Sequence, residues 1–279
     1  MRRCPTWLVS PAVDVLRQID DWDAEHAAAA AVRPDGVVAR HGPAGHVFYW
    51  ASVTKLTTSL ATLVAVEEGA VDLDEPAGPP GSTVRHLLAH TSGLPFDAGP
   101  PIARPGERRI YSNQGFERLA AHVEERTEIA FPEYLAAAVF GPLEMGAELR
   151  GSAASQVHGT LADLELFALE LLRPSLVAPA TLAEATSVQF PGLKGVLPGI
   201  GRFDPLDWGL GFELKDAKPN HWTGTLPSPR TFGHFGGAGT FLWVDPEHSL
   251  ALAALSDREF GDWAKAAWPA LSDAVVAAA

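Results

Sequence analysis

The stretch Ala51-Ser52-Val53-Thr54-Lys55 decides the fold and the chemistry that this sequence predicts. If the run is helical, Ser52 and Lys55 share one face a turn apart, so an amine can lie beside a hydroxyl. Residues 56–69 are apolar nearly all round, which is typical of a helix buried in a core. Ser52 is then expected at the N-terminus of that helix, where unpaired amides and the helix dipole favour negative charge. The alternative is an N-capping serine followed by an ordinary surface lysine.

Length and charge limit the classes of protein to be considered. The 279 residues, of which 47% are hydrophobic, suit one large domain or two closely packed lobes. A formal net charge of -13 argues against a nucleic-acid partner and against binding to an anionic membrane. The single cysteine, Cys4, excludes an internal disulfide framework and fits a reducing compartment. The basic start at residues 1–3 is followed by only a short, interrupted apolar stretch, so we expect no signal peptide and a cytoplasmic protein.

The N-terminal part predicts a helix and then a hairpin. Residues 11–31 carry Val13, Leu16, Ile19 and Trp22 at helical spacing. Residues 36–40 and 46–50 are rich in β-branched and aromatic side chains and are separated by a Gly/Pro turn. This pattern predicts a β-hairpin that leads directly into Ser52.

The middle of the chain predicts a series of helices. A short helix is expected within residues 83–95, where His86 and His90 lie four apart. No glutamate follows His86 and no third ligand is evident, so hydrogen-bonded structural histidines are favoured over a metal pair. Ser112 or Asn113 is expected to cap the next helix, which leaves Tyr111 free to point elsewhere.

Two further helices are predicted in this region, and strands follow it. The helices are expected at 131–139 and at 161–172, the second opened by a capping box. Strand-like runs occupy 208–214, 230–234, 240–244 and 249–255, and a helix is expected at 263–278. The glycine-rich run at 233–239 indicates either a strand edge lining a cleft or a bulge at a sheet corner.

These elements predict an α+β fold. An antiparallel sheet built from both termini is flanked by helices, and an all-helical lobe is inserted between the two halves of the sheet. We expect a single domain over residues 1–279, with the sheet lobe at about 1–50 and 191–279 and the helical lobe at about 51–190.

Three separated motifs, Ser52-Val53-Thr54-Lys55, Tyr111-Ser112-Asn113 and His234-Phe235-Gly236, resemble the set of the serine β-lactamase and penicillin-binding superfamily. The tyrosine form is similar to the class C β-lactamase, D-Ala-D-Ala carboxypeptidase and carboxylesterase branch. Residues 67–74 and 86–95 and the final helix also resemble that branch. The resemblance implies a β-lactamase/transpeptidase-like fold and an acyl-enzyme mechanism without a cofactor or metal.

The resemblance also implies roles for individual residues. It makes Ser52 the nucleophile, with Lys55 and Tyr111 completing the catalytic group, and it leaves open which of the latter two is the base. The oxyanion hole is expected at the backbone amides of Ser52 and Gly237. The substrate-binding residues that it implies are Asn113, His234, Gly236 and Gly237.

The last motif departs from members that recognise β-lactams, where a lysine and a hydroxyl residue meet the substrate carboxylate. Phe235 cannot donate a hydrogen bond, so strong β-lactamase activity is not expected. The favoured interpretation is a serine hydrolase acting on small-molecule esters or amides, most simply an esterase. The alternatives are a β-lactamase or D-Ala-D-Ala carboxypeptidase, and a non-catalytic ligand-binding or scaffold protein of the same fold. The oligomeric state is not predicted.

Overall fold

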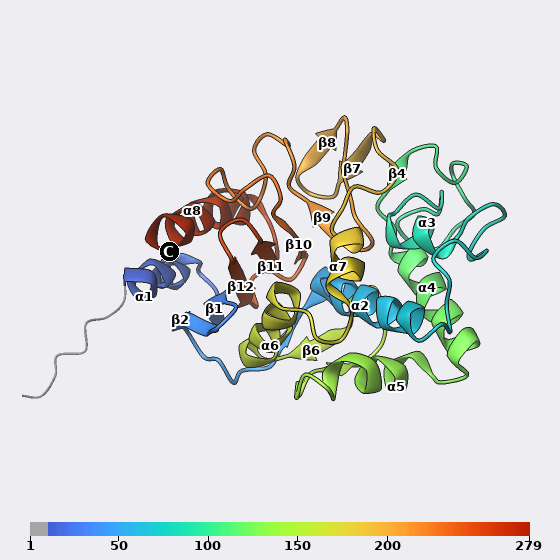
Figure 1. Cartoon of the computed structure of the whole chain (residues 1–279). Helices are drawn as coiled ribbons and strands as arrows, with labels where there is room; N and C mark the ends of the chain where they lie inside the picture. The colour runs from blue at the N-terminus through green and yellow to red at the C-terminus, as the bar shows by residue number, and fades with distance from the viewer. Residues whose placement is uncertain (1–10) are drawn as a thin grey trace, which may run out of the picture.

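A six-stranded antiparallel sheet organises the molecule (Figure 1). The structure is a computed structural model that describes residues 11–279, so Cys4 and the basic residues at the start lie outside it. N-terminal and C-terminal strands pair with each other, which confirms the predicted α+β fold with a sheet built from both ends of the chain. The strands in spatial order are β2 (Gly36–His41), β1 (Ala27–Arg33), β12 (Leu250–Ser256), β11 (Thr240–Asp245), β10 (Phe232–Gly236) and β9 (Glu213–Leu214).

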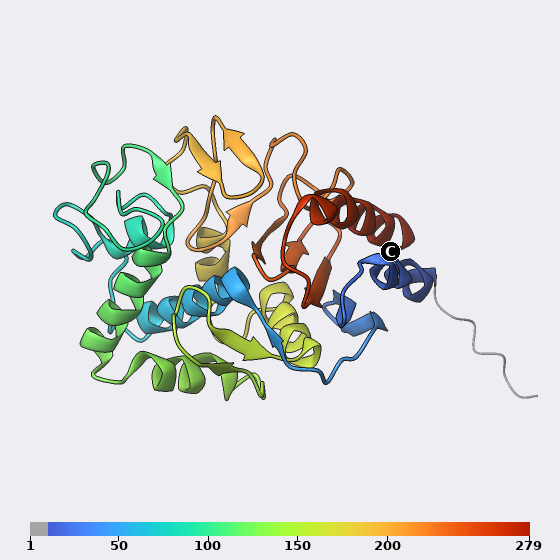
Figure 2. The same ribbon diagram turned by 180° about the vertical axis from the view of Figure 1, so that it is seen from behind.

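Helices cover both faces of this sheet. Side chains on β1 alternate between the faces: Ala28 and Ala30 enter one hydrophobic core, and Ala29 and Ala31 enter the other. Helix α6 (Leu161–Leu172) packs on the first face, and α1 (Pro11–Leu16) and α8 (Asp262–Ala278) pack on the second (Figures 1 and 2). Because β11 and β12 are buried on both sides, their residues form nearly continuous apolar runs.

The helix predicted over residues 11–31 is wrong in its second half. Helix α1 continues only as a 3-10 turn, Arg17–Asp21, and the chain reverses near Asp23, whose φ is 49°. Residues 27–33 are β1, which pairs with β2 on one side and β12 on the other. Long-range pairing has overridden the helix propensity of a run of alanines. Their small side chains let helices pack closely against both faces of the sheet.

The hairpin predicted from residues 36–40 and 46–50 is also wrong. The first run is β2 and pairs with β1, whereas the second contains β3 (Phe48–Tyr49), which pairs with β6 (Val157–Gly159). The cause lies at Trp50, which is fully buried and donates its indole N–H to the Gly159 carbonyl at 3.1 Å. This anchor draws the chain away from the sheet and into the helical part just before Ser52.

The inserted segment is mainly helical and also contains short strands. Its long central helix, α2 (Thr54–Glu67), is buried on almost every side, as predicted. Helix α6 has the predicted capping box between Thr160 and Asp163. The remaining helices are α3 (Val84–Leu88), α4 (Asn113–Thr127), α5 (Phe131–Leu135, continued by a π-helical turn, Ala136–Phe140) and α7 (Pro179–Ala185).

Two small three-stranded sheets complete the fold. One has the order β3, β6, β5, and the other has the order β4, β7, β8. Their remaining strands are β4 (Arg109–Ile110), β5 (Glu148–Leu149), β7 (Gly195–Leu197) and β8 (Gly201–Phe203). Over residues 11–279, no helix is both long enough and apolar enough to cross a membrane.

Two other predicted elements are shorter than expected. The helix within residues 83–95 ends at Leu88, because His90 turns the chain with a φ of 57°. The strand at 208–214 is reduced to β9, because Gly209 and Gly211 form a tight turn in which the Gly209 amide donates to Phe212 O at 2.8 Å.

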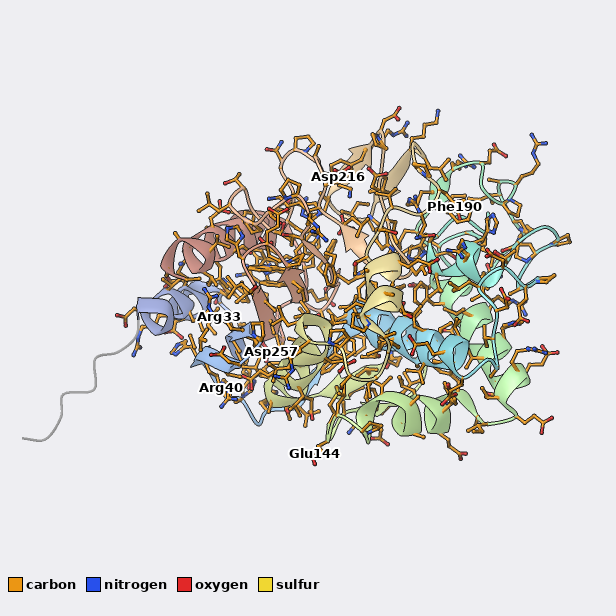
Figure 3. The ribbon with its side chains drawn as sticks, in the orientation of Figure 1. Arg33, Arg40, Glu144, Phe190, Asp216 and Asp257 are labelled. Carbon is orange, nitrogen blue, oxygen red and sulfur yellow. The ribbon has the colours of Figure 1, made fainter. Side chains whose placement is uncertain are left out.

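An ion pair joins the edge of the main sheet to the helix that covers it. Arg40 lies on β2 (Figure 3). Its Nε donates to Oε1 of Glu165 on α6 at 2.6 Å. The Glu165 carboxylate is nearly buried, so this pair fixes α6 over the sheet.

Candidate active site

Ser52 lies in a strained turn at the start of the buried helix. The 3-10 turn Ala51–Val53 runs directly into α2, and Ala51 has a φ of 46°, in the left-handed region that alanine rarely adopts. Thr240 on β11 donates its hydroxyl to the Trp50 carbonyl at 2.8 Å. The Trp50 amide donates to the carbonyl of Val157, at the start of β6, at 2.9 Å. Two strands distant in sequence therefore hold the turn that presents Ser52.

Lys55 lies beside Ser52 and is fully buried. Its Nζ lies 3.3 Å from Ser52 Oγ, 2.7 Å from Asn113 Oδ1 and 2.8 Å from the Ala154 carbonyl. Burial lowers the pKa of Lys55 to about 7, although the charge of Glu117 acts to raise it. In the neutral amine, two N–H groups serve Asn113 and Ala154, and the lone pair is left for the Ser52 hydroxyl proton.

Tyr111 faces the same pair. Its hydroxyl makes a side-chain hydrogen bond with Ser52, and Lys55 Nζ lies 4.8 Å from the centre of its ring. Burial raises the pKa of Tyr111 far above its usual value, while the hydrogen bond with Ser52 acts to lower it. Tyr111 is therefore a neutral phenol at physiological pH, which can donate a proton more readily than it can accept one.

A helix cap positions Tyr111 and Asn113 on the two sides of Ser112. The Ser112 hydroxyl accepts a hydrogen bond from the Gly115 amide at 2.9 Å, so Ser112 caps α4, as predicted for one of these two residues. The Ser112 amide donates to His90 Nδ1 at 3.1 Å. With Ser112 fixed, Asn113 is the first residue of α4 and can reach Lys55.

His234 is neutral, and its ring packs against the ring of Tyr111. Its ring centre lies 5.6 Å from that of Tyr111, and burial lowers the pKa of His234 to about 3. Nδ1 lies 2.6 Å from the carbonyl of Phe235, so Nδ1 carries the proton and Nε2 is an acceptor. Within residues 11–279, Nε2 of His234 has no hydrogen-bond partner. His234 therefore offers no positive charge to a substrate carboxylate.

The glycines after His234 allow the sheet edge to approach the serine turn. A Cβ on Gly236 would lie 2.5 Å from the Trp50 carbonyl and 3.0 Å from Ala51 Cβ, so no side chain fits at this position. Gly237 lines a cavity of about 510 Å³ together with Ser52 and Asn113. The glycine-rich run is thus a strand edge lining a cleft, one of the two readings of the sequence.

Phe235 points away from this cleft. Its ring packs against Phe260 and Trp268 at centroid distances of 5.0 and 5.8 Å, in the core beneath α8. The position therefore contributes packing and no hydroxyl group, whichever substrate occupies the cleft.

Some neighbours of the site carried no functional prediction. The Ala154 carbonyl, which binds Lys55, comes from a loop backbone, for which a sequence gives no signal. Trp208 stands 5.9 Å from the Tyr111 ring and 5.6 Å from the His234 ring, and its indole nitrogen has no partner among the described residues. The strand predicted over residues 208–214 gave no indication that Trp208 packs beside the rings of Tyr111 and His234.

His86 and His90 have structural contacts. His86 Nδ1 lies 2.8 Å from the Thr83 hydroxyl, and His90 stacks against Tyr111 with ring centres 4.6 Å apart. His90 therefore supports the tyrosine from behind, and neither histidine belongs to a group of close metal-ligating atoms among the described residues.

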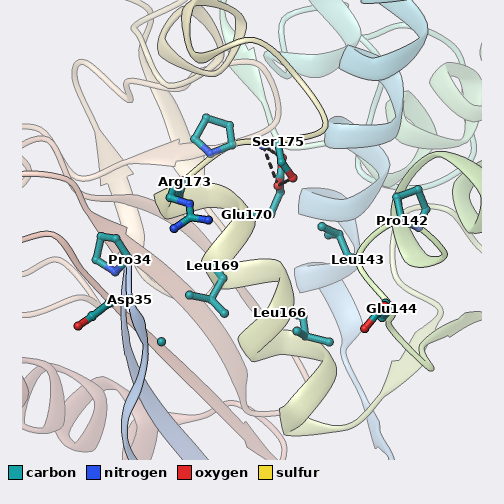
Figure 4. A pocket seen from close by; sticks show the side chains of 12 residues that line it. Pro34, Asp35, Pro142, Leu143, Glu144, Leu166, Leu169, Glu170, Arg173 and Ser175 are labelled. Atoms are coloured by element: carbon teal, nitrogen blue, oxygen red, sulfur yellow. Dashed lines mark hydrogen bonds between the residues drawn. The ribbon is translucent and has the colours of Figure 1, made fainter.

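A separate hollow lies away from these residues (Figure 4). It measures about 480 Å³ and lies beside α6. Three acidic residues line it, Asp35, Glu144 and Glu170, and Glu170 accepts hydrogen bonds from the backbone amides of Ser175 and Leu176 at 2.8 to 2.9 Å. Glu170 therefore fixes the loop after α6, and the hollow shares no lining residue with the cavity at Ser52.

Comparisons with known proteins agree with this geometry. The family model described as beta-lactamase matches residues 14–276. The chain belongs to the β-lactamase family. A β-lactamase from Mycobacterium bovis is 55% identical, with a TM-score of 0.93 over 94% of this chain and 98% of that one. The hydrolase EstCE1, which has promiscuous acyltransferase activity, shares the β-lactamase-family fold at 17% identity, with a TM-score of 0.76 over 95% of this chain and 97% of that chain.

One curated relative of this β-lactamase-family chain is penicillin-binding protein 4* from Bacillus subtilis. It is 27% identical over 132 residues, which are 36% of this chain. The match spans 29% of that protein's length. Together the comparisons confirm the superfamily and its hydrolase fold, and the class C branch and the substrate stay predictions.

Proposed function

We propose that the chain is a serine hydrolase that forms an acyl-enzyme on Ser52 and acts as an esterase on small-molecule esters or amides. The observation that carries this proposal is the buried amine of Lys55, 3.3 Å from Ser52 Oγ. A lysine whose pKa burial has lowered to about 7 is partly neutral at physiological pH and can take a proton from serine. The amine of Lys215 is also buried, but it donates to backbone carbonyls, whereas the Lys55 amine lies beside a hydroxyl that lines a cavity.

The mechanism assigns a step to each group. Lys55 accepts the Ser52 proton while Oγ attacks the carbonyl carbon, and the amides of Ser52 and Gly237 stabilise the oxyanion. Donors of this kind are worth about 3 to 4 kcal/mol each. Tyr111 gives its proton to the leaving alcohol or amine as the carbon–oxygen or carbon–nitrogen bond breaks, and it recovers a proton from Lys55. Water then attacks the acyl-enzyme with the same base, which releases the acid and restores Ser52.

Asn113 and His234 hold the substrate in this scheme. Asn113 shares its side chain between Lys55 and the acyl group, because Oδ1 accepts from Lys55 and the amide nitrogen stays free to donate. His234 stands at the position where relatives carry a lysine, and it accepts a hydrogen bond from a substrate N–H or O–H. A substrate without a carboxylate next to the scissile bond suits this neutral ring.

A β-lactamase activity is the second candidate, supported by the 55% identity to the β-lactamase from Mycobacterium bovis. The neutral His234 and the inward-facing Phe235 argue against efficient binding of a β-lactam carboxylate. Nitrocefin turnover with kcat/KM above that for p-nitrophenyl butyrate would favour this candidate over the esterase.

The test of the proposed function is covalent labelling. The wild-type chain is treated with a fluorophosphonate probe and assayed with p-nitrophenyl butyrate, and intact mass reports the adduct. We expect Ser52→Ala to lose both labelling and turnover, and Ser187→Ala, an exposed serine after α7, to keep both. Labelling of Ser52→Ala at the wild-type level would remove Ser52 from the mechanism.

A further inference from the structure

A third hollow is lined in part by Tyr111 and not by Ser52. It measures about 400 Å³ and lies between residues 96–111 and the β7–β8 hairpin. Strand β4, directly before Tyr111, pairs in parallel with β7, which brings the two walls together. Three exposed apolar side chains line it: Phe96, Ile102 and Val196, with 45%, 54% and 50% of their surfaces accessible. Exposed apolar groups gathered in a concave site indicate a ligand surface.

The same hollow has a positively charged rim. Arg108, Lys194 and Arg202 line it and are exposed. None of the three forms a salt bridge within residues 11–279, and no carboxylate lines the hollow. Nearby, Arg104 is already paired with Glu107 at 3.7 Å. The chain as a whole has a net charge of -13, yet this hollow carries three exposed cations without a salt bridge. Its local charge is therefore opposite to that of the whole chain.

The cavity at Ser52 has the opposite charge. Asp257 and Glu259 line it, and Asp257 accepts a hydrogen bond from the His26 amide at 3.0 Å. Tyr111 connects the two spaces: it lines the cationic hollow, and its side chain interacts with Ser52, which lines the other cavity. A substrate lying across Tyr111 therefore meets a carboxylate-lined wall at one end and a cationic wall at the other.

We propose that the cationic hollow binds the leaving group of the substrate, and that this leaving group has an apolar body and an anionic group at its far end. The inference rests on the proposed function, because it takes Tyr111 as the group that protonates the leaving atom. The apolar body lies on Phe96, Ile102 and Val196. Its carboxylate, sulfate or phosphate pairs with Arg108, Lys194 and Arg202, several bonds away from the scissile bond. The acyl group occupies the cavity at Ser52 and carries no negative charge.

Three esters that differ in where the charge lies test this proposal. They are 2-nitrophenyl butyrate (neutral), 3-butyryloxy-4-nitrobenzoate (anionic leaving group) and mono-2-nitrophenyl adipate (anionic acyl group). Each kcat/KM is divided by the rate of hydroxide-catalysed hydrolysis of the same ester. We expect the anionic leaving group to be preferred about tenfold over the neutral one, and the anionic acyl group to be disfavoured. About 0.5 M salt should reduce both effects.

Charge removal at the rim provides the matched variants. The triple variant Arg108→Gln, Lys194→Gln, Arg202→Gln should lose the preference and keep turnover of the neutral ester within about twofold, since that ester has no charge to pair with these side chains. Arg230→Gln, an exposed arginine outside both spaces, should leave all three rates unchanged. A preference that persists in the triple variant, or an anionic acyl ester that reacts best, overturns the proposal.

A binding measurement separates this proposal from the proposed function. The product 3-hydroxy-4-nitrobenzoate is titrated into the wild-type and triple-variant proteins by calorimetry. Binding by the wild type that is lost in the triple variant supports the hollow even if no ester is turned over, in which case only the hydrolase proposal fails. Equal binding by both proteins, or none by the wild type, overturns the hollow even if the neutral ester is hydrolysed.

Discussion

Glu117→Gln is expected to shift the pH profile of kcat/KM, although Glu117 does not line the cavity at Ser52. Glu117 is exposed on α4, and its charge raises the pKa of the buried Lys55. Glutamine removes the charge but keeps an acceptor for the Ser152 hydroxyl, which Glu117 binds in the wild type. If neutral Lys55 is the base, the substitution should lower the pKa of Lys55 and shift the rising limb of kcat/KM to lower pH.

The structure sets the position of that limb. Burial lowers the pKa of Lys55 from 10.5 to about 7. The wild-type enzyme should therefore reach about a tenth of its plateau kcat/KM at pH 6, half at pH 7 and about nine-tenths at pH 8. An amine with the ordinary pKa would be only about 0.03% neutral at pH 7. The lowered pKa thus raises the concentration of the reactive base by about three orders of magnitude.

The assay is the pH dependence of p-nitrophenyl butyrate hydrolysis from pH 5 to 9. Glu125→Gln, an exposed position later on the same helix that does not act on Lys55, is the control and should give the wild-type profile. A limb with its midpoint above pH 9 would assign the base to Tyr111, because burial raises the pKa of that phenol. A midpoint near pH 7 that Glu117→Gln does not lower would refute the assignment of the limb to Lys55.

Three further predictions concern the parts that support the site. Gly236→Ala should reduce kcat/KM at least tenfold in ester assays, since the new methyl group would lie 2.5 Å from the Trp50 carbonyl and displace the serine turn. Glu213→Leu should lower the free energy of unfolding by about 3 kcal/mol in urea, because it leaves buried His221 without the carboxylate 2.8 Å away, and an unchanged midpoint would contradict this. Because the folded-state pKa of Lys55 lies below its unfolded value, unfolding takes up a proton between about pH 7 and 10.5, and stability should rise with pH across that window. Between pH 7 and 9.5 the rise should be about 3 kcal/mol larger in the wild type than in Lys55→Met, and equal slopes would show that the amine is not held neutral.

Local patterns were enough to predict the elements that carry the proposed chemistry. The three-residue spacing of Ser52 and Lys55 places both groups on one helical face whatever the rest of the chain does. The apolar run after them predicted the buried helix α2. At 111–113, the need of α4 for a cap predicted that role for Ser112 or Asn113 and left Tyr111 free, and the structure assigns the cap to Ser112. In each case, short-range geometry decides the outcome.

Long-range contacts explain what the sequence did not predict. The alanines of β1 are excellent helix formers, and only pairing with β12, more than 200 residues away, makes them a strand. Likewise, β3 pairs with β6 and does not form the predicted hairpin, because the Trp50 indole N–H donates to the Gly159 carbonyl. The third oxygen around Lys55, the Ala154 carbonyl, belongs to the backbone and so has no identifying side chain.

The hydrogen bond from Thr240 to the Trp50 carbonyl joins positions 190 residues apart. Gly236 and Gly237 lie near Ser52 only when β10 and β11 pack against the turn that carries it. A nascent chain that has released its first 200 residues from the ribosome therefore holds the nucleophile and its amine but lacks one wall of the cleft. If the chain is the proposed hydrolase, its activity should appear only when β10 and β11 dock. A fragment that ends before Phe232 should therefore show no hydrolysis of p-nitrophenyl butyrate.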